Sequence, residues 1–315
     1  MYFSDLAYII NWWFILFIIG IIFLPLMSKV LSNFLDQGYI FAKVLGFGII
    51  TYILFLLGTL KILPFTQPAI LLTLIASLSF NVFLIHKNPR VLTTLKKSWR
   101  FFFFEELLFF VSLLFWSYVR AHEPSIHGLE KYMDFGFVNS ILRTDYFPPK
   151  DMWYPPLPIN YYYFGHLITA VLTKLSGIDS VITYNLMIAT LFAFTFTGAF
   201  SIGANLVTNL KLNAKPYTLY ASIGGLLTAF LVSFAGNLHT IYTLFKPYLT
   251  ENPIPFWQLP FSPSTFPNSY WYPNATRFIS NTIHEFPLYS FVVSDLHGHV
   301  LDIPVVLLML AVLLS

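Results

Sequence analysis

Apolar stretches of about 20 residues recur along this chain of 315 residues. They cover approximately residues 8–27, 40–60, 68–86, 101–119, 183–207 and 217–236. An α-helix rises about 1.5 Å per residue, so each stretch is long enough to cross the roughly 30 Å hydrocarbon core of a bilayer. The pattern predicts an all-α polytopic membrane protein with about six to eight membrane helices.

Composition supports this class and excludes others. Only 10% of the residues are charged and 57% are hydrophobic, whereas soluble domains carry about 25% charged residues. The net charge of +3 is not concentrated in a basic stripe, so we expect no nucleic-acid partner. The absence of cysteine excludes disulfides, thiolate metal sites and a thiol nucleophile.

The distribution of basic residues predicts the orientation. The segment between the third and fourth apolar stretches contains no acidic residue and five basic ones, which are Lys87, Arg90, Lys96, Lys97 and Arg100. The positive-inside rule places this segment in the cytoplasm. The N-terminus and the polar segment 120–160 are then extracytoplasmic.

We therefore divide the chain, as a single transmembrane domain, into five parts. These are four spans in 8–119, a first outer loop in 120–182, two spans in 183–236, a second outer loop in 237–302 and the start of a further span in 303–315. The last stretch is too short to cross a bilayer, so we expect the natural protein to continue beyond Ser315.

The two loops share an aromatic and proline-rich character, so we expect both on the same side. An even number of crossings must then separate them. The apolar stretch 163–175 is short and contains His166 and Lys174, which predicts an interfacial or re-entrant helix. The alternative is that the loops face different compartments.

The first loop contains two carboxylates four residues apart, Glu130 and Asp134. On a helix they share one face, where they could bind a divalent ion or act as acid and base. A solvated helix face beside Lys131 is the alternative reading.

The same loop ends in three tyrosines, Tyr161, Tyr162 and Tyr163, followed by His166. Tyrosine rings suit a sugar ring or a lipid head group, and His166 could carry a proton or contact a phosphate. An interfacial aromatic belt with a structural histidine explains the same pattern.

The second loop contains His284 and Glu285, and then Asp295, His297 and His299 within five residues. Carboxylate and imidazole ligands suit zinc, manganese or iron. The sequence leaves a divalent metal site and a hydrogen-bonded packing cluster open.

Two carboxylates lie within the fourth apolar stretch, at Glu105 and Glu106. A charge at membrane depth is costly. We expect these groups to reach the cytoplasmic interface or to be neutral.

These motifs together resemble a known family. The relevant residues are Glu130-Lys131-x-Met133-Asp134, Pro148-Pro149-x-Asp151-x-Trp153, Asn160-Tyr161-Tyr162-Tyr163-Phe164-Gly165-His166, and Glu285-Phe286-Pro287 followed by Asp295-Leu296-His297. They resemble the bacterial and archaeal YYY membrane proteins, a domain family of unknown function. One departure is Gly298, where the family pattern leads us to expect proline.

That family in turn looks like the C superfamily of glycosyltransferases (GT-C), which use polyprenyl-phosphate sugars. The resemblance implies a prokaryotic plasma-membrane protein with extracytoplasmic functional loops that carry short interfacial helices. It implies Asp134 as the leading catalytic carboxylate with Glu130 as its partner, and a lipid-linked sugar as substrate.

We assign the other candidates by analogy. Substrate-binding candidates are Tyr161, Tyr162, Tyr163, His166, Trp153, Asp151, Glu285 and His284, and metal candidates are Asp295, His297 and His299. The alternatives are a transporter or flippase for an amphipathic substrate, and a non-catalytic membrane scaffold. A transporter would place its decisive polar groups inside the helix bundle.

Overall fold

A computed structural model describes residues 3–209, 217–236, 238–248, 254–266, 268, 275–277, 279 and 281–315. The described residues form helices and contain no sheet, apart from two isolated bridges. The prediction of an all-α fold is confirmed.

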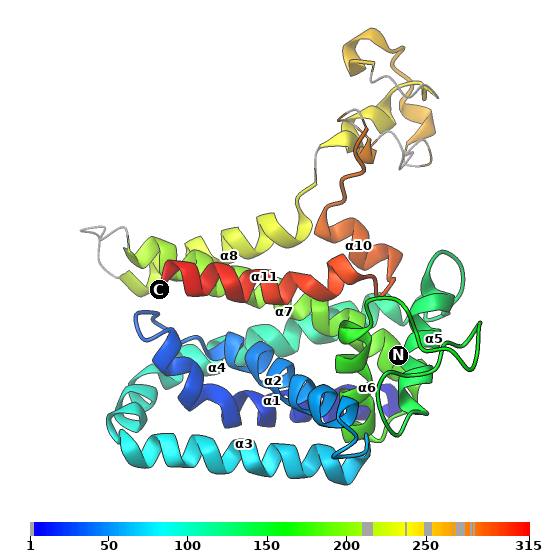
Figure 1. Cartoon of the computed structure of the whole chain (residues 1–315). Helices are drawn as coiled ribbons and strands as arrows, with labels where there is room; N and C mark the ends of the chain where they lie inside the picture. The colour runs from blue at the N-terminus through cyan, green and yellow to red at the C-terminus, as the bar shows by residue number, and fades with distance from the viewer. Residues whose placement is uncertain are drawn as a thin grey trace.

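Five helices are long and apolar enough to cross a membrane: α1 (Phe3–Val30), α2 (Tyr39–Thr59), α3 (Gln67–Lys87), α4 (Arg90–Arg120) and α7 (Ser180–Asn209). Two shorter apolar helices, α8 (Tyr217–Phe234) and α11 (Gly298–Leu314), lie along them (Figure 1). The protein is thus a multi-pass integral membrane protein. Within the described residues, the five long helices are fewer than the six to eight membrane helices predicted, and the two shorter apolar helices bring the total to seven.

Helix α7 forms the centre of the bundle. It packs against α4, α8 and α11, and nearly all residues of its apolar central part are buried. A Cβ atom on Gly203 of α7 would stand 2.5 Å from Thr228 Cβ of α8. Glycine therefore lets these two helices approach closely, as is common between membrane helices.

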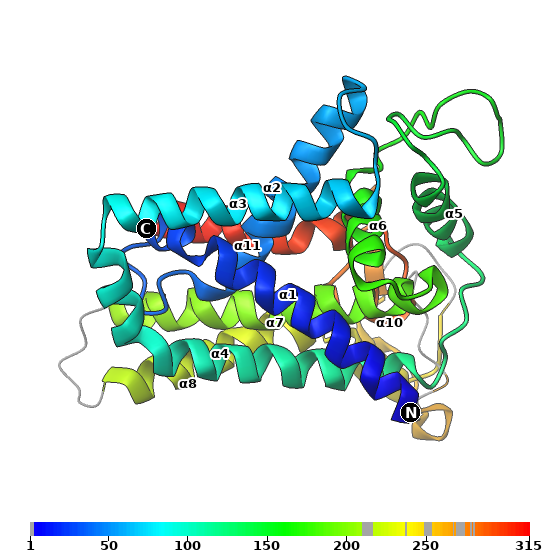
Figure 2. The same ribbon diagram turned by 90° about the horizontal axis from the view of Figure 1, so that it is seen from below.

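The short helices gather at one end of the bundle. Helices α5 (Lys131–Leu142), α6 (Phe164–Ser176) and α10 (Pro287–Val293) lie at the end that holds the N-terminus, whereas Ser315 lies at the other end (Figures 1 and 2). Helix α7 leads away from this end and α8 returns to it. The two loop regions consequently meet at the same end.

The stretch predicted as an interfacial or re-entrant helix is α6. Its 13 residues span only about 20 Å, too little to cross a bilayer. Residues 166–173 are buried, and α6 contacts α1, α2, α3, α5, α7 and α11. It is therefore an internal helix of the bundle end.

Helix α4 is longer than the apolar stretch predicted for it. It begins at Arg90, so the segment expected to be a basic loop is largely the first turns of a helix. Long cationic side chains extend along such a helix end toward water, which lets the helix continue through a basic segment.

The second outer loop adds three short 3-10 helices: η1 (His239–Leu244), η2 (Phe256–Gln258) and η3 (Pro263–Thr265). Their aromatic residues pack on one another, for example Phe245 on Phe256 with ring centroids 5.5 Å apart. In Figure 1 these turns lie apart from the helix bundle.

Candidate functional site

A fully buried carboxylate and imidazole pair lies between α5 and α6. His166 Nε2 is 3.0 Å from Asp134 Oδ1, and both side chains are about 1% exposed. The Phe137 ring packs edge-on against the imidazole, with centroids 5.4 Å apart. An ionised carboxylate only accepts hydrogen bonds, so with Asp134 ionised Nε2–H is the donor and Nδ1 is the nitrogen left for other chemistry.

In the described part of the chain, each residue of this pair also has one polar atom that forms no hydrogen bond. Asp134 Oδ2 and His166 Nδ1 are buried, and neither has a hydrogen-bond partner within the described part of the chain. Buried polar atoms without partners are rare in proteins and call for an explanation. Their occurrence in one pair is consistent with a ligand-binding or catalytic role.

Glu130 forms a second carboxylate and imidazole pair. Its Oε2 lies 3.3 Å from His297 Nε2, and both side chains are partly exposed. The Tyr162 ring stacks parallel to the His297 ring at 6.5 Å. Glu130 and Asp134, although four residues apart, therefore contact different histidines, and their side chains do not form a joint carboxylate site.

A third such pair joins the end of the second loop to α11. His299 Nε2 lies 2.9 Å from Glu285 Oε2. The Ser290 hydroxyl lies 3.2 Å from the same Glu285 oxygen and from His299 Nε2. Loop residues distant in sequence thus orient the first turn of α11.

Asp295 connects the two loops. Its Oδ1 atom is buried and has no hydrogen-bond partner among the residues that the structure describes, and the Lys131 ammonium stands 3.6 Å away. Burial raises the pKa of Asp295 above its ordinary value, although the Lys131 charge opposes the shift.

The predicted metal ligands are close in space but face different partners. Asp295 faces Lys131, His297 faces Glu130, and His299 faces Glu285. Among residues whose structure is described, no three His, Asp or Glu side chains gather in a way that could hold a metal ion. The geometry shows an array of ion pairs, and the metal hypothesis receives no support from it.

The remaining candidates have distinct positions. The Tyr161 hydroxyl donates to the Tyr162 hydroxyl at 2.7 Å, whereas Tyr163 is half-buried and packs on Phe55. These three tyrosines therefore do not form one flat surface.

Asp151 and Trp153 lie in the hairpin-like turn after α5. Asp151 Oδ1 accepts from the Trp153 and Tyr154 backbone N–H groups at 2.7 and 3.0 Å, which is a side-chain-stabilised turn. Trp153 is exposed. His284 is half-buried, and its backbone N–H donates to Thr276 O at 2.9 Å.

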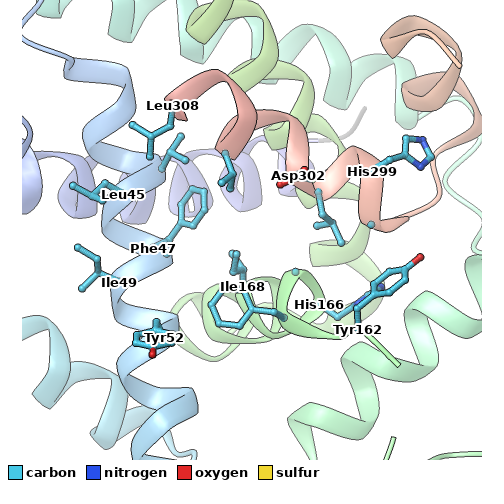
Figure 3. A pocket seen from close by; sticks show the side chains of 17 residues that line it. Leu45, Phe47, Ile49, Tyr52, Tyr162, His166, Ile168, His299, Asp302 and Leu308 are labelled. Atoms are coloured by element: carbon cyan, nitrogen blue, oxygen red, sulfur yellow. The ribbon is translucent and has the colours of Figure 1, made fainter. Parts of the chain in front are cut away.

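A groove of about 800 Å³ opens between α2, α6 and α11 (Figure 3). Most of its wall is apolar, from α2 residues such as Phe47 and Ile49 and from Leu308 of α11. Polar side chains gather at one end of it, where Tyr162, His166, His299 and Asp302 line the groove. Sequence reasoning missed Asp302, which follows the motif residues by three positions.

A smaller polar cavity of about 230 Å³ lies beside the groove. Its lining includes Glu130, Glu285, Asp295 and His297. His299 lines both spaces. A long apolar channel and a small charged cavity therefore share one wall.

Gly298, the departure from the family pattern, lies at this junction. A Cβ atom at Gly298 would stand 2.6 Å from Tyr162 Cε2. The absence of a side chain lets the Tyr162 ring lie against the start of α11. Proline at this position would require that ring to move.

A second polar network lies inside the bundle. Lys43 Nζ contacts both Glu106 oxygens at 2.7 and 2.5 Å, and Glu106 also accepts from Trp13 Nε1 and the Tyr39 hydroxyl, each at 2.6 Å. Glu105 is buried and hydrogen-bonded to Asp36. Of the two alternatives expected for Glu105 and Glu106, reaching the interface is wrong, because both side chains are buried inside the protein. Partners on α1 and α2 satisfy Glu106, whereas Glu105 Oε2 has no hydrogen-bond partner among the described residues.

Comparison with known proteins gives one result. The chain belongs to the family described as uncharacterized membrane protein (DUF2298), whose model matches residues 49–315. No curated protein and no solved structure matches the chain. The resemblance to a membrane-protein family of unknown function is confirmed at this level.

Proposed function

We propose that this protein is a membrane enzyme of glycosyltransferase type, which transfers a sugar from a polyprenyl-phosphate donor at the extracytoplasmic face. One observation carries the proposal: the apolar groove and the charged cavity share His299. A lipid-linked sugar has the same two parts, a long apolar tail and a charged, hydroxyl-rich head. Most ligand pockets likewise combine apolar walls with a few converging polar groups.

The tail would lie along α2 and α11. Phe47, Ile49 and Leu308 line this part of the groove. They belong to α2, which is long and apolar enough to cross a membrane, and to α11, a shorter apolar helix. A polyprenyl chain could therefore remain in an apolar environment while its head group occupies the outer end.

The head group would meet the histidines. His297 and His299 each have a carboxylate partner that fixes the ring, and an imidazole held in this way can donate a hydrogen bond to a phosphate oxygen when protonated. The partly exposed Tyr161 and Tyr162 rings provide flat surfaces for a sugar.

The buried pair would supply the base. Asp134 does not line the groove, whereas His166 does, so we assign Asp134 the orientation of His166 rather than direct contact with substrate. His166 lines the groove, and Nδ1 would take the proton of the acceptor hydroxyl. The acceptor oxygen then bonds to the anomeric carbon, while the bond to phosphate breaks and its electron pair leaves with the polyprenyl phosphate. General base catalysis of this kind contributes typically about 10²–10⁴-fold to a rate.

The test is sugar transfer by the full-length protein in proteoliposomes that contain a radiolabelled polyprenyl-phosphate sugar. We expect His166→Gln and Asp134→Asn each to lower the transfer rate about 10²-fold or more with donor binding retained. Glu123→Gln is the matched control, because Glu123 is an exposed carboxylate of the same loop. Equal transfer rates in the unchanged protein and its three variants would show that His166 is not the base.

A transporter or flippase is the second candidate function. The buried network around Lys43 and Glu106 favours it, because transporters place ionisable groups inside the bundle. Movement of a fluorescent polyprenyl lipid between leaflets, measured in the same proteoliposomes, distinguishes the two functions. Lipid movement that is lost in Glu106→Gln, without sugar transfer in the unchanged protein, would favour transport.

A further inference from the structure

A cavity of about 600 Å³ lies on another side of the bundle, between α1, α4 and α7. Its walls include Asp5 and Tyr8 of α1, Ser117 and Arg120 of α4, and Asn185 of α7. None of the helices α2, α6 and α11 contributes to it, so it is separate from the groove of the proposed active site. Arg120 is the last residue of a membrane-spanning helix, which places the cavity at the end of the bundle that holds the N-terminus.

Arg120 is buried in this cavity with a neutral partner. Its Nε and one terminal nitrogen donate to Asn185 Oδ1 at 3.0 and 2.6 Å, and its side chain is 7% exposed. The Asn185 amide is fixed, because its Nδ2 donates to Pro124 O and Val181 O. The asparagine oxygen therefore faces the guanidinium and holds it in one orientation.

The guanidinium keeps donors for a ligand. Arginine has five N–H donors, and the two contacts with Asn185 use two of them. Arg120 forms no ion pair with a carboxylate in the described part of the chain. The Glu123 carboxylate acts on Arg120 electrostatically, but without ion-pair contact. A buried guanidinium that no carboxylate contacts directly is costly, so an anion that enters the cavity would stabilise it.

Ser117 gives a second, independent indication. It precedes Arg120 by three residues, so both lie on the same face of α4. Its hydroxyl is buried and has no hydrogen-bond partner within the described residues. A hydroxyl donor and an oriented guanidinium on one cavity wall match the oxygens of a phosphate group.

We propose that this cavity binds the phosphodiester head group of a membrane phospholipid, with Arg120 and Ser117 as its hydrogen-bond donors. Asp5 also lines the cavity, and Glu123 interacts electrostatically with Arg120. These carboxylates favour a singly charged phosphodiester over a doubly charged free phosphate. The position at the end of a spanning helix is also the depth of lipid head groups.

The test is lipid binding by the full-length protein in detergent, measured by native mass spectrometry with added phosphatidylglycerol or phosphate-free monogalactosyl diacylglycerol. We expect phosphatidylglycerol to bind preferentially. Arg120→Gln should weaken that binding about tenfold or more, because a hydrogen bond to a charged group is lost.

Two further variants keep the test decisive. Ser117→Ala removes only a hydroxyl without a protein partner, so it should fold normally and weaken binding a few-fold even if Arg120→Gln is unstable. Arg143→Gln is the matched charge control, because Arg143 is exposed and does not line the cavity. Equal phosphatidylglycerol binding by Ser117→Ala, Arg120→Gln and Arg143→Gln would overturn the proposal.

A third arm distinguishes the source of the phosphate. Inorganic phosphate, added at increasing concentration, should not displace the bound phosphatidylglycerol. Displacement that depends on Arg120 would assign the cavity to free phosphate and overturn the lipid assignment.

Discussion

The buried ion pair inside the bundle gives the most quantitative prediction. Lys43 is fully buried, and its ammonium lies within 2.7 Å of both Glu106 oxygens. Lys43→Met keeps an unbranched apolar side chain of similar length. Of the donors that the described residues supply to the Glu106 carboxylate, it leaves those of Trp13 and Tyr39. Removing one partner of a buried ion pair costs about 3–5 kcal/mol. The Lys43 ammonium also lies 4.4 Å from the centroid of the Phe109 ring. The loss of this contact is included in the total of about 3–5 kcal/mol.

The double variant Lys43→Met with Glu106→Gln tests the cause of this loss. Both charges are then absent, and the glutamine oxygen can still accept from Trp13 or Tyr39. We expect the double variant to lose less free energy of unfolding than the two single variants lose together. The difference should be about 2 kcal/mol or more, since residues in direct contact couple by up to about 3 kcal/mol. The assay is reversible unfolding in detergent micelles, followed by circular dichroism. Losses that simply add would refute the claim that the charges of this pair stabilise each other.

Two further predictions concern packing and pH. Gly20→Ala should destabilise the protein by about 1–3 kcal/mol, because the new Cβ would stand 2.7 Å from Lys43 Cγ. Gly48→Ala is the control: its Cβ meets no atom within 4 Å, so it should be neutral or slightly stabilising. Equal effects of the two variants in the same unfolding assay would contradict this prediction. The pKa of Asp295 is raised in the folded state, so the unfolded state releases this proton at a lower pH than the folded state does. The free energy of unfolding should therefore fall as pH rises from the ordinary aspartate pKa through the raised value of the folded state. At a pH above this range, Asp295→Asn should therefore be more stable than the unchanged protein, and below the range it should not. Melting temperatures over a pH series would show this. A difference that does not depend on pH would contradict the raised pKa of Asp295.

The membrane helices could be predicted from the sequence because their signal is local. The stretch 40–60 corresponds to α2 (Tyr39–Thr59), and the stretch 183–207 lies within α7. Helix length and hydrophobicity follow from neighbouring residues alone. The extension of α4 to Arg90 was missed because charged residues at a helix end carry no clear boundary signal.

The arrangement of the candidate site could be predicted only in part. Sequence reasoning selected Asp134 and His166 separately, but their pairing joins residues 32 positions apart on two helices that are adjacent only in the folded chain. Spacing suggested that Glu130 and Asp134 act together, whereas tertiary contacts turn each toward a different histidine. A pattern of carboxylates along one helix cannot show which residues of other elements face it.

The interior network shows the same limit. Glu105 and Glu106 were recognised as unusual because of the cost of membrane charges, but their partners Asp36 and Lys43 lie about 60 to 70 residues away in the sequence. Hydropathy reports the cost of a charge at a position. It does not report whether another helix compensates for that cost.

The most direct test of the proposed function asks whether a polyprenyl-phosphate donor occupies the groove between α2, α6 and α11. The chain contains no cysteine, so a single introduced cysteine can be labelled covalently by a bromoacetamide-bearing polyprenyl phosphate analogue. Leu45→Cys and Leu308→Cys place the thiol in the groove wall, and Phe80→Cys places it in the cavity beside α3. The account predicts labelling at positions 45 and 308 that unlabelled donor suppresses, and no suppressible labelling at position 80. Labelling that is equal at all three positions, or unaffected by unlabelled donor, would contradict it.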